Sequence, residues 1–260
     1  MDYVVVSLIA LLVSALTLFS GFGLGTVLMP AFALFFVVPV AIAATAVVHL
    51  ANNVFKVILV GKNANGRVVV AFALPGAGAA AIGAALLNWF AQAAPLFRYA
   101  LADRIHEVTG LKLVIGLLIV VFAVLELLPR FRELAFDRKY LPLGGMLSGF
   151  FGGLSGNQGA LRSAFLVKAG LDKEAFIGTG VVSAVIVDTA RLLVYGWSFY
   201  TAQFEQASGI WGRVLAATLA AFLGAFIGAR LIKKVTLTAI QNIVAAMLLV
   251  VGLAMAAGLV

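Results

Sequence analysis

The sequence predicts an all-α polytopic membrane protein, and three observations lead to that class. Of its 260 residues, 64% are hydrophobic and 11% are charged, whereas a soluble domain carries roughly 25% charged residues. The mean hydropathy is +1.16. Long apolar runs, such as residues 113–121 and 244–260, lack the alternation of apolar and polar residues that a membrane β-barrel needs. The spans are therefore expected to be helices of about 20 residues each.

Polar interruptions divide the chain into about 8–10 helical segments. Glycines break two of the apolar blocks near their middle, whereas the other blocks read as uninterrupted spans. The longest hydrophilic loop lies near the midpoint, so we expect a first transmembrane repeat over residues 1–128, a connecting loop over 129–140 and a second repeat over 141–260. In order, the expected segments are the block 3–38 broken at 20–25, spans 40–61 and 68–90, a polar loop-like stretch 98–112, a span ending at 129, the block 141–171 broken at 152–159, and spans 173–196, 211–232 and 237–260.

The two halves present their motifs in the same order. FSGFGLG at 19–25 matches FFGGLSGNQG at 150–159, and IGAALL at 82–87 matches IGARLI at 227–232. If each broken block is a hairpin that returns to its own side, each half has one hairpin and three full spans. Three is an odd number of crossings, so the second half starts on the opposite side of the membrane and the halves are inverted. Eleven of the 18 Lys and Arg residues then lie on one side, four on the other and three within apolar blocks. The positive-inside rule makes the richer side cytoplasmic, which predicts a multi-pass protein of the cytoplasmic (inner) membrane with both termini outside.

The two broken blocks indicate a function. Paired, glycine-interrupted helices in inverted repeats are typical of secondary transporters. A helix that starts at membrane depth presents free N–H groups and the positive end of its dipole, which hold anions. Gly23 and Gly25 in the first break, and Gly156 and Gly159 in the second, allow the backbone to approach a ligand closely. The alternative is that these glycines serve close helix packing.

At these motifs the chain resembles the sulfite exporter TauE/SafE family, also called the toluene-sulfonate uptake permease family. The resemblance rests on GFGLGTVLMP at 21–30, GFFGGLSGNQGALRSAFL at 149–166 and GTGVVSAVIVDTARLLVYG at 178–196. It implies two repeated halves that move small anionic sulfur or organic compounds across the cytoplasmic membrane. Asn157 and Gln158 stand where glycines are common in the family.

The second apolar block carries a stripe of polar residues on one helical face. Thr45, His49, Asn52, Asn53 and Lys56 recur at helical spacing, and the positions that flank them are apolar. We interpret the stripe as part of a translocation path, with an interhelical hydrogen-bond seam as the alternative. His49 has an ordinary pKa of about 6.5 and is a candidate proton carrier, unless it is a neutral structural histidine. Lys56 is also long enough to snorkel to the cytoplasmic interface.

Three charged residues of the second half lie within apolar blocks. Asp188 and Arg191 stand three residues apart, so they either neutralise each other or take part in proton coupling. Arg162 falls in the first turn of the helix expected after the second break, where a guanidinium opposes the helix dipole unless an anion lies nearby. This conflict is the best single-residue argument for an anionic substrate. A snorkelling contact with lipid phosphate is the alternative.

Together these patterns predict a secondary transporter, a permease or exporter, for a small anion such as sulfite, a sulfonate or another organosulfur or carboxylate anion. No enzyme, cofactor or metal-site motif is found, and no basic run indicates nucleic acid. The expected partners are the anion and the lipid bilayer. Proton coupling through His49, Asp188 or Arg191 stays open, and so does a homodimer. The alternative functions are a passive anion channel and an accessory membrane subunit of a larger complex. The expected substrate-binding residues, at the hairpin tips near the bilayer midplane, are Gly23, Gly25, Thr26, His49, Asn52, Asn53, Gly156, Asn157, Gln158, Gly159 and Arg162.

Overall fold

The computed structural model describes residues 2–17, 24–101, 104–128, 130, 134–198, 210–231 and 237–259. Helices dominate these residues, which confirms the all-α polytopic class. The described elements are α1 (Asp2–Thr17), α2 (Leu24–Ala33), α3 (Val38–Val60), η1 (Gly61–Asn63), α4 (Gly66–Ala91), β1 (Pro95–Leu101), β2 (Arg104–Thr109), α5 (Gly110–Leu127), η2 (Arg138–Tyr140), α7 (Leu141–Ser155), α8 (Gly159–Leu166), α9 (Lys173–Ser198), α10 (Ile210–Leu231) and α11 (Leu237–Ala256).

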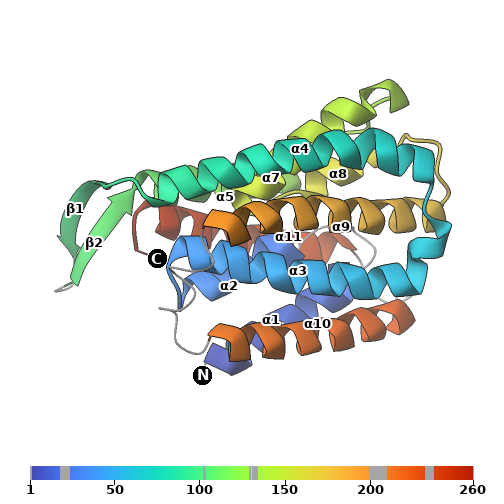
Figure 1. Cartoon of the computed structure of the whole chain (residues 1–260). Coiled ribbons are helices and arrows are strands. Elements are labelled where there is room, and N and C mark those ends of the chain that lie inside the picture. Colours follow the sequence, from blue (N-terminus) through green and yellow to red (C-terminus); the bar gives the residue numbers. More distant parts are fainter. Residues whose placement is uncertain are drawn as a thin grey trace.

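Six helices pack side by side in the order α7, α4, α9, α3, α10 and α1, and α5 packs against α11 behind this row (Figure 1). Of the described helices, α3, α4, α9 and α10 are long and apolar enough to cross a membrane. The two central helices, α3 and α9, run in opposite directions, because the start of α9 meets the end of α3: a Cβ on Gly178 would lie 2.8 Å from the carbonyl oxygen of Val60. The apolar window of α3 is 72% buried, against 33% for α10. The polar stripe of α3 therefore lies at the centre of the protein.

Both broken blocks fold back toward the end at which they begin. Phe136, just ahead of α7, donates its N–H to the carbonyl of Ala164 near the end of α8, at 3.1 Å. In the first half, Arg213 Nε lies 2.6 Å from the carboxylate of Asp2 at the start of α1. The same guanidinium lies 5.2 Å from the ring centroid of Phe36, just beyond α2. The second helix of each pair thus ends near the side on which the first helix begins.

Small residues bring the α4–α7 and α1–α10 pairs to backbone distance. A Cβ on Gly145, Gly149 or Gly153 of α7 would meet backbone atoms of α4. A Cβ on Gly224 or Gly228 of α10 would meet backbone atoms of α1. Stripes of small residues are the usual means of close packing between membrane helices. Much of the glycine that precedes the second break therefore serves packing.

The stretch expected as a polar loop over 98–112 is instead an antiparallel hairpin of β1 and β2, which projects beyond the helix ends (Figure 1). Cross-strand pairs stabilise it: Arg98 forms an ion pair with Glu107 at 2.8 Å, and the ring of Tyr99 stacks on that of His106. The sequence showed only that this stretch is polar, and the structure shows that opposite charges in it pair across two strands.

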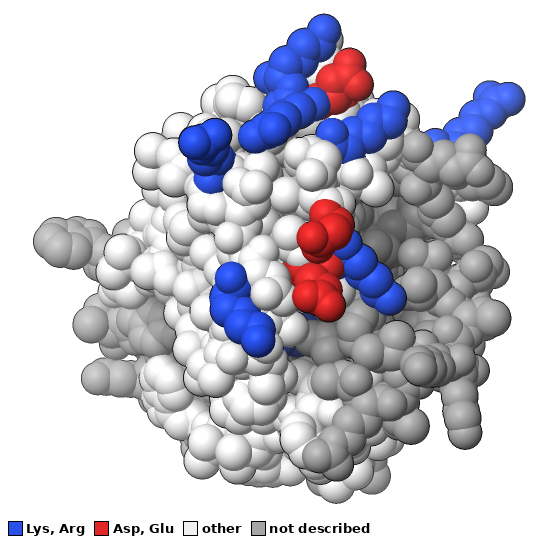
Figure 2. Space-filling model, turned by 90° about the vertical axis from the view of Figure 1, so that its right-hand side faces the viewer, with Lys and Arg blue, Asp and Glu red and all other residues white. Residues whose placement is uncertain are grey.

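Charge gathers at the end where α3 gives way to α4. Figure 2 shows this end, where Lys and Arg outnumber Asp and Glu. The two termini lie toward the other end, near the β-hairpin (Figure 1). The exposed basic residues near the element ends there are Lys62, Arg67, Arg138, Lys139, Lys168 and Lys173.

Candidate functional site

The second break separates α7 from α8 at residues 156–158 and is held by specific hydrogen bonds. Gly156 ends α7 with its N–H 3.0 Å from the carbonyl of Gly152 and with φ of +83°, a left-handed conformation that glycine adopts without strain. Ser148 Oγ donates to the carbonyl of Gln158 at 2.8 Å, which ties the far side of the break back to α7. The break is shorter than expected from the sequence, since the glycines ahead of it continue α7.

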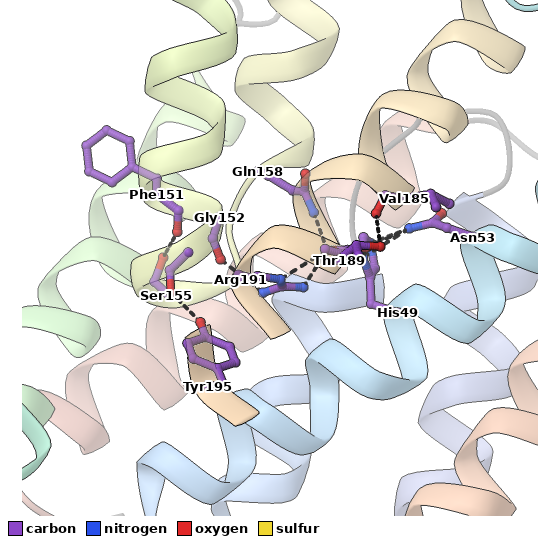
Figure 3. Close-up of polar contacts among 12 residues, drawn as sticks. His49, Asn53, Phe151, Gly152, Ser155, Gln158, Val185, Thr189, Arg191 and Tyr195 are labelled. Atoms are coloured by element: carbon purple, nitrogen blue, oxygen red, sulfur yellow. Dashed lines mark hydrogen bonds and ion pairs between the residues drawn. The ribbon is translucent and has the colours of Figure 1, made fainter. Parts of the chain in front are cut away.

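The Asp188 carboxylate of α9 collects four side chains, which converge beside the break (Figure 3). His49 Nδ1 and Asn53 Nδ2 of α3 lie 2.6 and 3.1 Å from Asp188 Oδ2. Gln158 Nε2 donates to Oδ1 at 2.7 Å. Arg191 Nε and Nη2 lie 3.0 and 2.8 Å from the same oxygen. These five residues, the Asp188 network, are all buried, and Asp188 and Arg191 have no exposed surface.

The network also holds the C-terminal end of α7. Arg191 Nη1 donates to the carbonyl of Gly152 at 2.9 Å, and the Tyr195 hydroxyl donates to the carbonyl of Gly153 (Figure 3). A helix end leaves its last carbonyls unpaired, and a cation there is favourable. Tyr195 is a residue that the sequence reasoning missed. It stands four residues after Arg191, so the helical period of α9 was the signal that could have found it.

The first broken block reaches the same place. A Cβ on Gly25, in the first turn of α2, would lie 3.1 Å from the carbonyl oxygen of Gly156 and 3.6 Å from His49 Cδ2. The start of α2 therefore touches both the second break and α3. Gly23 lies outside the described residues, and the side chain of Thr26 lies outside the described side chains.

A second polar group, the Lys56 cluster, lies on the other side of α3. It consists of Ser14 of α1, Asn52 and Lys56 of α3, and the carbonyl of Ala221 of α10. With the Asn52 amide oriented to satisfy its neighbours, its nitrogen donates to the Ala221 carbonyl at 3.2 Å and its oxygen accepts from Lys56 Nζ at 3.2 Å. Lys56 is 5% exposed, so it is enclosed by protein and does not snorkel along the surface.

Arg162 of α8 contacts the Asp188 network through Gln158. Its Nη1 donates to Gln158 Oε1 at 3.4 Å, and a Cβ on Gly180 of α9 would lie 3.7 Å from its Nε. The guanidinium is buried, so its charge is poorly screened.

The buried charges do not balance. Among the described residues, the buried side chains that are ordinarily cationic are Lys56, Arg162 and Arg191, and Asp188 is the one buried carboxylate. With His49 neutral and Lys56 charged, the described buried side chains carry two more positive than negative charges. Taking an ion out of water costs several kcal/mol unless it is compensated, so this interior favours an anion.

Several buried polar atoms near this region have no hydrogen-bond partner. They include Thr45 Oγ1, one turn before His49, and both side-chain atoms of Asn157, inside the break. Ser183 Oγ of α9 is another. Buried polar groups are normally paired, so these atoms are free to bind a polar solute. In the described part of the chain, no group of three or more His, Asp or Glu residues could hold a metal ion.

The structure brings together most of the expected site residues, but it divides the polar stripe. Asn52 turns toward α1 and α10, whereas His49 and Asn53 turn toward α9. The ion pair expected between Asp188 and Arg191 is present. The expected residues that meet at or beside the second break are Gly25, His49, Asn53, Gly156, Asn157, Gln158, Gly159, Arg162, Asp188 and Arg191.

A helical membrane protein with discontinuous helices and a charged interior belongs to the class of polar-solute transporters. The chain belongs to the sulfite exporter TauE/SafE family, whose model matches residues 6–255. No curated protein and no solved structure gives a significant match. Family membership makes the protein a membrane transporter, not an enzyme, of the kind that carries sulfite and sulfonate-type anions.

Proposed function

We propose that the chain is a secondary transporter that binds one small oxyanion, such as sulfite, a sulfonate or another organosulfur or carboxylate anion, where the two hairpin tips meet. The tips are the first turn of α2 at Gly25 and the second break at 156–158. Arg162 supplies the main charge, and the free amide of Asn157 supplies hydrogen bonds.

The excess of buried positive charge is the observation that carries this proposal. Asp188 is already bonded to His49, Asn53, Gln158 and Arg191 through both oxygens, so it is poorly placed to neutralise a further cation. An oxyanion at Arg162 would offset the cost of burying that guanidinium, and a guanidinium matches the geometry of sulfonate and carboxylate oxygens. The start of α8 adds backbone N–H groups to the same place.

The inverted duplication is supported by the helix order. We match each helix of the first half with one of the second: α1 with α7, α2 with α8, α3 with α9, α4 with α10 and α5 with α11. When each helix in the row α7, α4, α9, α3, α10, α1 is replaced by its match, the result is the same row in reverse order. The α5–α11 pair maps onto itself. We propose that this pseudo-symmetry spans the repeats 1–128 and 141–260.

The charged end of Figure 2 supports an orientation in the cytoplasmic membrane with that end inside and both termini outside. A transporter with opposed hairpins at its centre can open the same site alternately to the two sides.

Counterflow in proteoliposomes tests the proposal. Vesicles are loaded with unlabelled sulfite, methanesulfonate, sulfoacetate or acetate, and uptake of the labelled anion is measured. Arg162→Gln is expected to raise the concentration for half-maximal uptake by roughly tenfold to a hundredfold, since a hydrogen bond to a charged group contributes about 1.5–3 kcal/mol. Lys168→Gln makes the same change of charge at an exposed residue just beyond α8 and is expected to leave uptake unchanged.

Three outcomes contradict the proposal. Ohmic currents without counterflow indicate a passive channel. No flux of any tested anion by the purified protein indicates an accessory subunit. Equal effects of the Arg162 and Lys168 substitutions place the anion elsewhere.

A further inference from the structure

Lys56 lies in a part of the bundle that offers it hydrogen bonds but no counter-charge. The side chain is 5% exposed, and its Nζ lies 3.2 Å from the amide oxygen of Asn52. Asn52 in turn meets Ser14 of α1 and the carbonyl of Ala221 of α10, and these three residues have no exposed surface. Among the described side chains, no ion pair joins Lys56 to a carboxylate. The oxygen found at the ammonium is therefore a neutral one.

The sequence explains why no carboxylate lies near Lys56. The three helices that form the Lys56 cluster, α1, α3 and α10, carry a single acidic residue, Asp2. Asp2 lies at the start of α1, about 18 Å along the helix from Ser14, and its carboxylate is bound by Arg213 at 2.6 Å. These helices therefore have no acidic side chain that could neutralise Lys56.

The second half of the chain handles its own buried cation differently. Arg191 of α9 forms an ion pair with Asp188, three residues before it, and also binds the end of α7. In the helix matching proposed above, α3 corresponds to α9 and α1 to α7. Lys56 of α3 likewise lies beside α1, but Asn53 and Asn52 occupy the positions three and four residues before it. Amides thus stand where Arg191 has a carboxylate, and a counter-charge for Lys56 has to come from outside these helices.

We propose that Lys56 and Ser14 form a second subsite for a small oxyanion, a sulfonate or a carboxylate, which supplies this counter-charge. An ammonium has three N–H donors, and Asn52 accepts one of them, so two remain for the oxygens of an anion. The Ser14 hydroxyl, which shares the Asn52 amide, can rotate to donate to the same anion. The resulting ion pair offsets the cost of taking the ammonium out of water.

This inference rests on the proposed function for the class of its ligand, but not for the position of the subsite. The Lys56 cluster faces α1 and α10, whereas Asn53 and the rest of the Asp188 network lie toward α9. An anion at Lys56 is therefore additional to the anion that we propose between the hairpin tips.

The test counts the anions that the purified protein binds at equilibrium. The four anions of the panel above are used in labelled form, in detergent micelles without anionic lipid, so that a lipid phosphate cannot fill the subsite. The wild type is expected to bind two anions per chain. Lys56→Gln keeps a donor for Asn52 but removes the charge, and it is expected to weaken one site by about tenfold to a hundredfold, the contribution of a hydrogen bond to a charged group.

Three further variants sharpen the test. Lys56→Arg keeps the positive charge and is expected to keep both sites. Ser14→Ala removes one neutral donor with little change of volume, and it is expected to weaken the same site as Lys56→Gln by about twofold to tenfold. Lys62→Gln is the matched control, because it makes the same change of charge at an exposed residue of η1, and it is expected to leave both sites unchanged.

The outcomes separate this inference from the proposed function. Wild-type protein that binds none of the four anions overturns both. A single anion per chain overturns the inference alone, and so do two anions that Lys56→Gln and Ser14→Ala leave unchanged or that Lys62→Gln weakens equally. Wild-type protein that retains phosphatidylglycerol in place of the second anion, and loses this lipid in Lys56→Gln, would make the subsite a lipid phosphate site and overturn its assignment to a solute.

Discussion

Asp188→Asn tests whether the Asp188 network holds the centre of the fold together. The substitution keeps the volume of the side chain but removes its charge and one of its two acceptor oxygens. In one orientation the new amide nitrogen faces His49 and Asn53, and in the other it faces Gln158 and Arg191. One set of buried donors loses its acceptor in either case, and Arg191 stays buried without its counter-charge.

The expected loss of stability is about 3–5 kcal/mol, the usual cost of removing one partner from a buried ion pair. The free energy of unfolding is measured by SDS titration in mixed micelles and followed by tryptophan fluorescence. Asp137→Asn is the control, since Asp137 is exposed and its side chain caps no helix; a change within about 0.5 kcal/mol is expected there. A loss below about 1 kcal/mol for Asp188→Asn would show that the network contributes little and would refute this reasoning.

Two further substitutions probe the end of α7 by the same titration. Gly156→Ala is expected to cost about 1–2 kcal/mol, because a φ of +83° strains an L residue. The control is Gly78→Ala, which has open space around a helical position and is expected to be neutral or stabilising. Equal effects of the two substitutions would contradict a backbone cause. Tyr195→Phe is expected to cost about 1–3 kcal/mol, because it leaves the buried carbonyl of Gly153 without its donor. A neutral Tyr195→Phe would mean that this carbonyl is satisfied in another way.

The glycine breaks and the polar stripe were readable from the sequence because the membrane makes each of them costly. A break in a helix at membrane depth, or an asparagine in an apolar span, costs free energy unless something satisfies it. Such features therefore stand out against an apolar background. The pair Asp188 and Arg191 was visible for the same reason, and their spacing fixed their contact within one helix.

The partners of the stripe could not be read from the sequence, because they depend on which helices become neighbours. Asn52 and Asn53 are adjacent, so they point about 100° apart on α3. That angle is enough to direct Asn53 to α9 and Asn52 to α1 and α10. One amide then serves the Asp188 network and the other serves Lys56. A helical stripe records which positions avoid lipid, but not which of two neighbours each position meets.

This division separates the buried charges that hold the fold together from those that we propose bind the substrate. Asp188 neutralises Arg191 and, through Gln158, fixes the second break, so its charge is used by the fold. Arg162 and Lys56 add two more buried side chains that are ordinarily cationic. If the fold needed only charge balance, a second buried carboxylate would supply it, yet the described interior has one. On our proposal the substrate anion supplies the missing negative charge. Because no carboxylate of the protein occupies that place, the site can be emptied when the anion leaves.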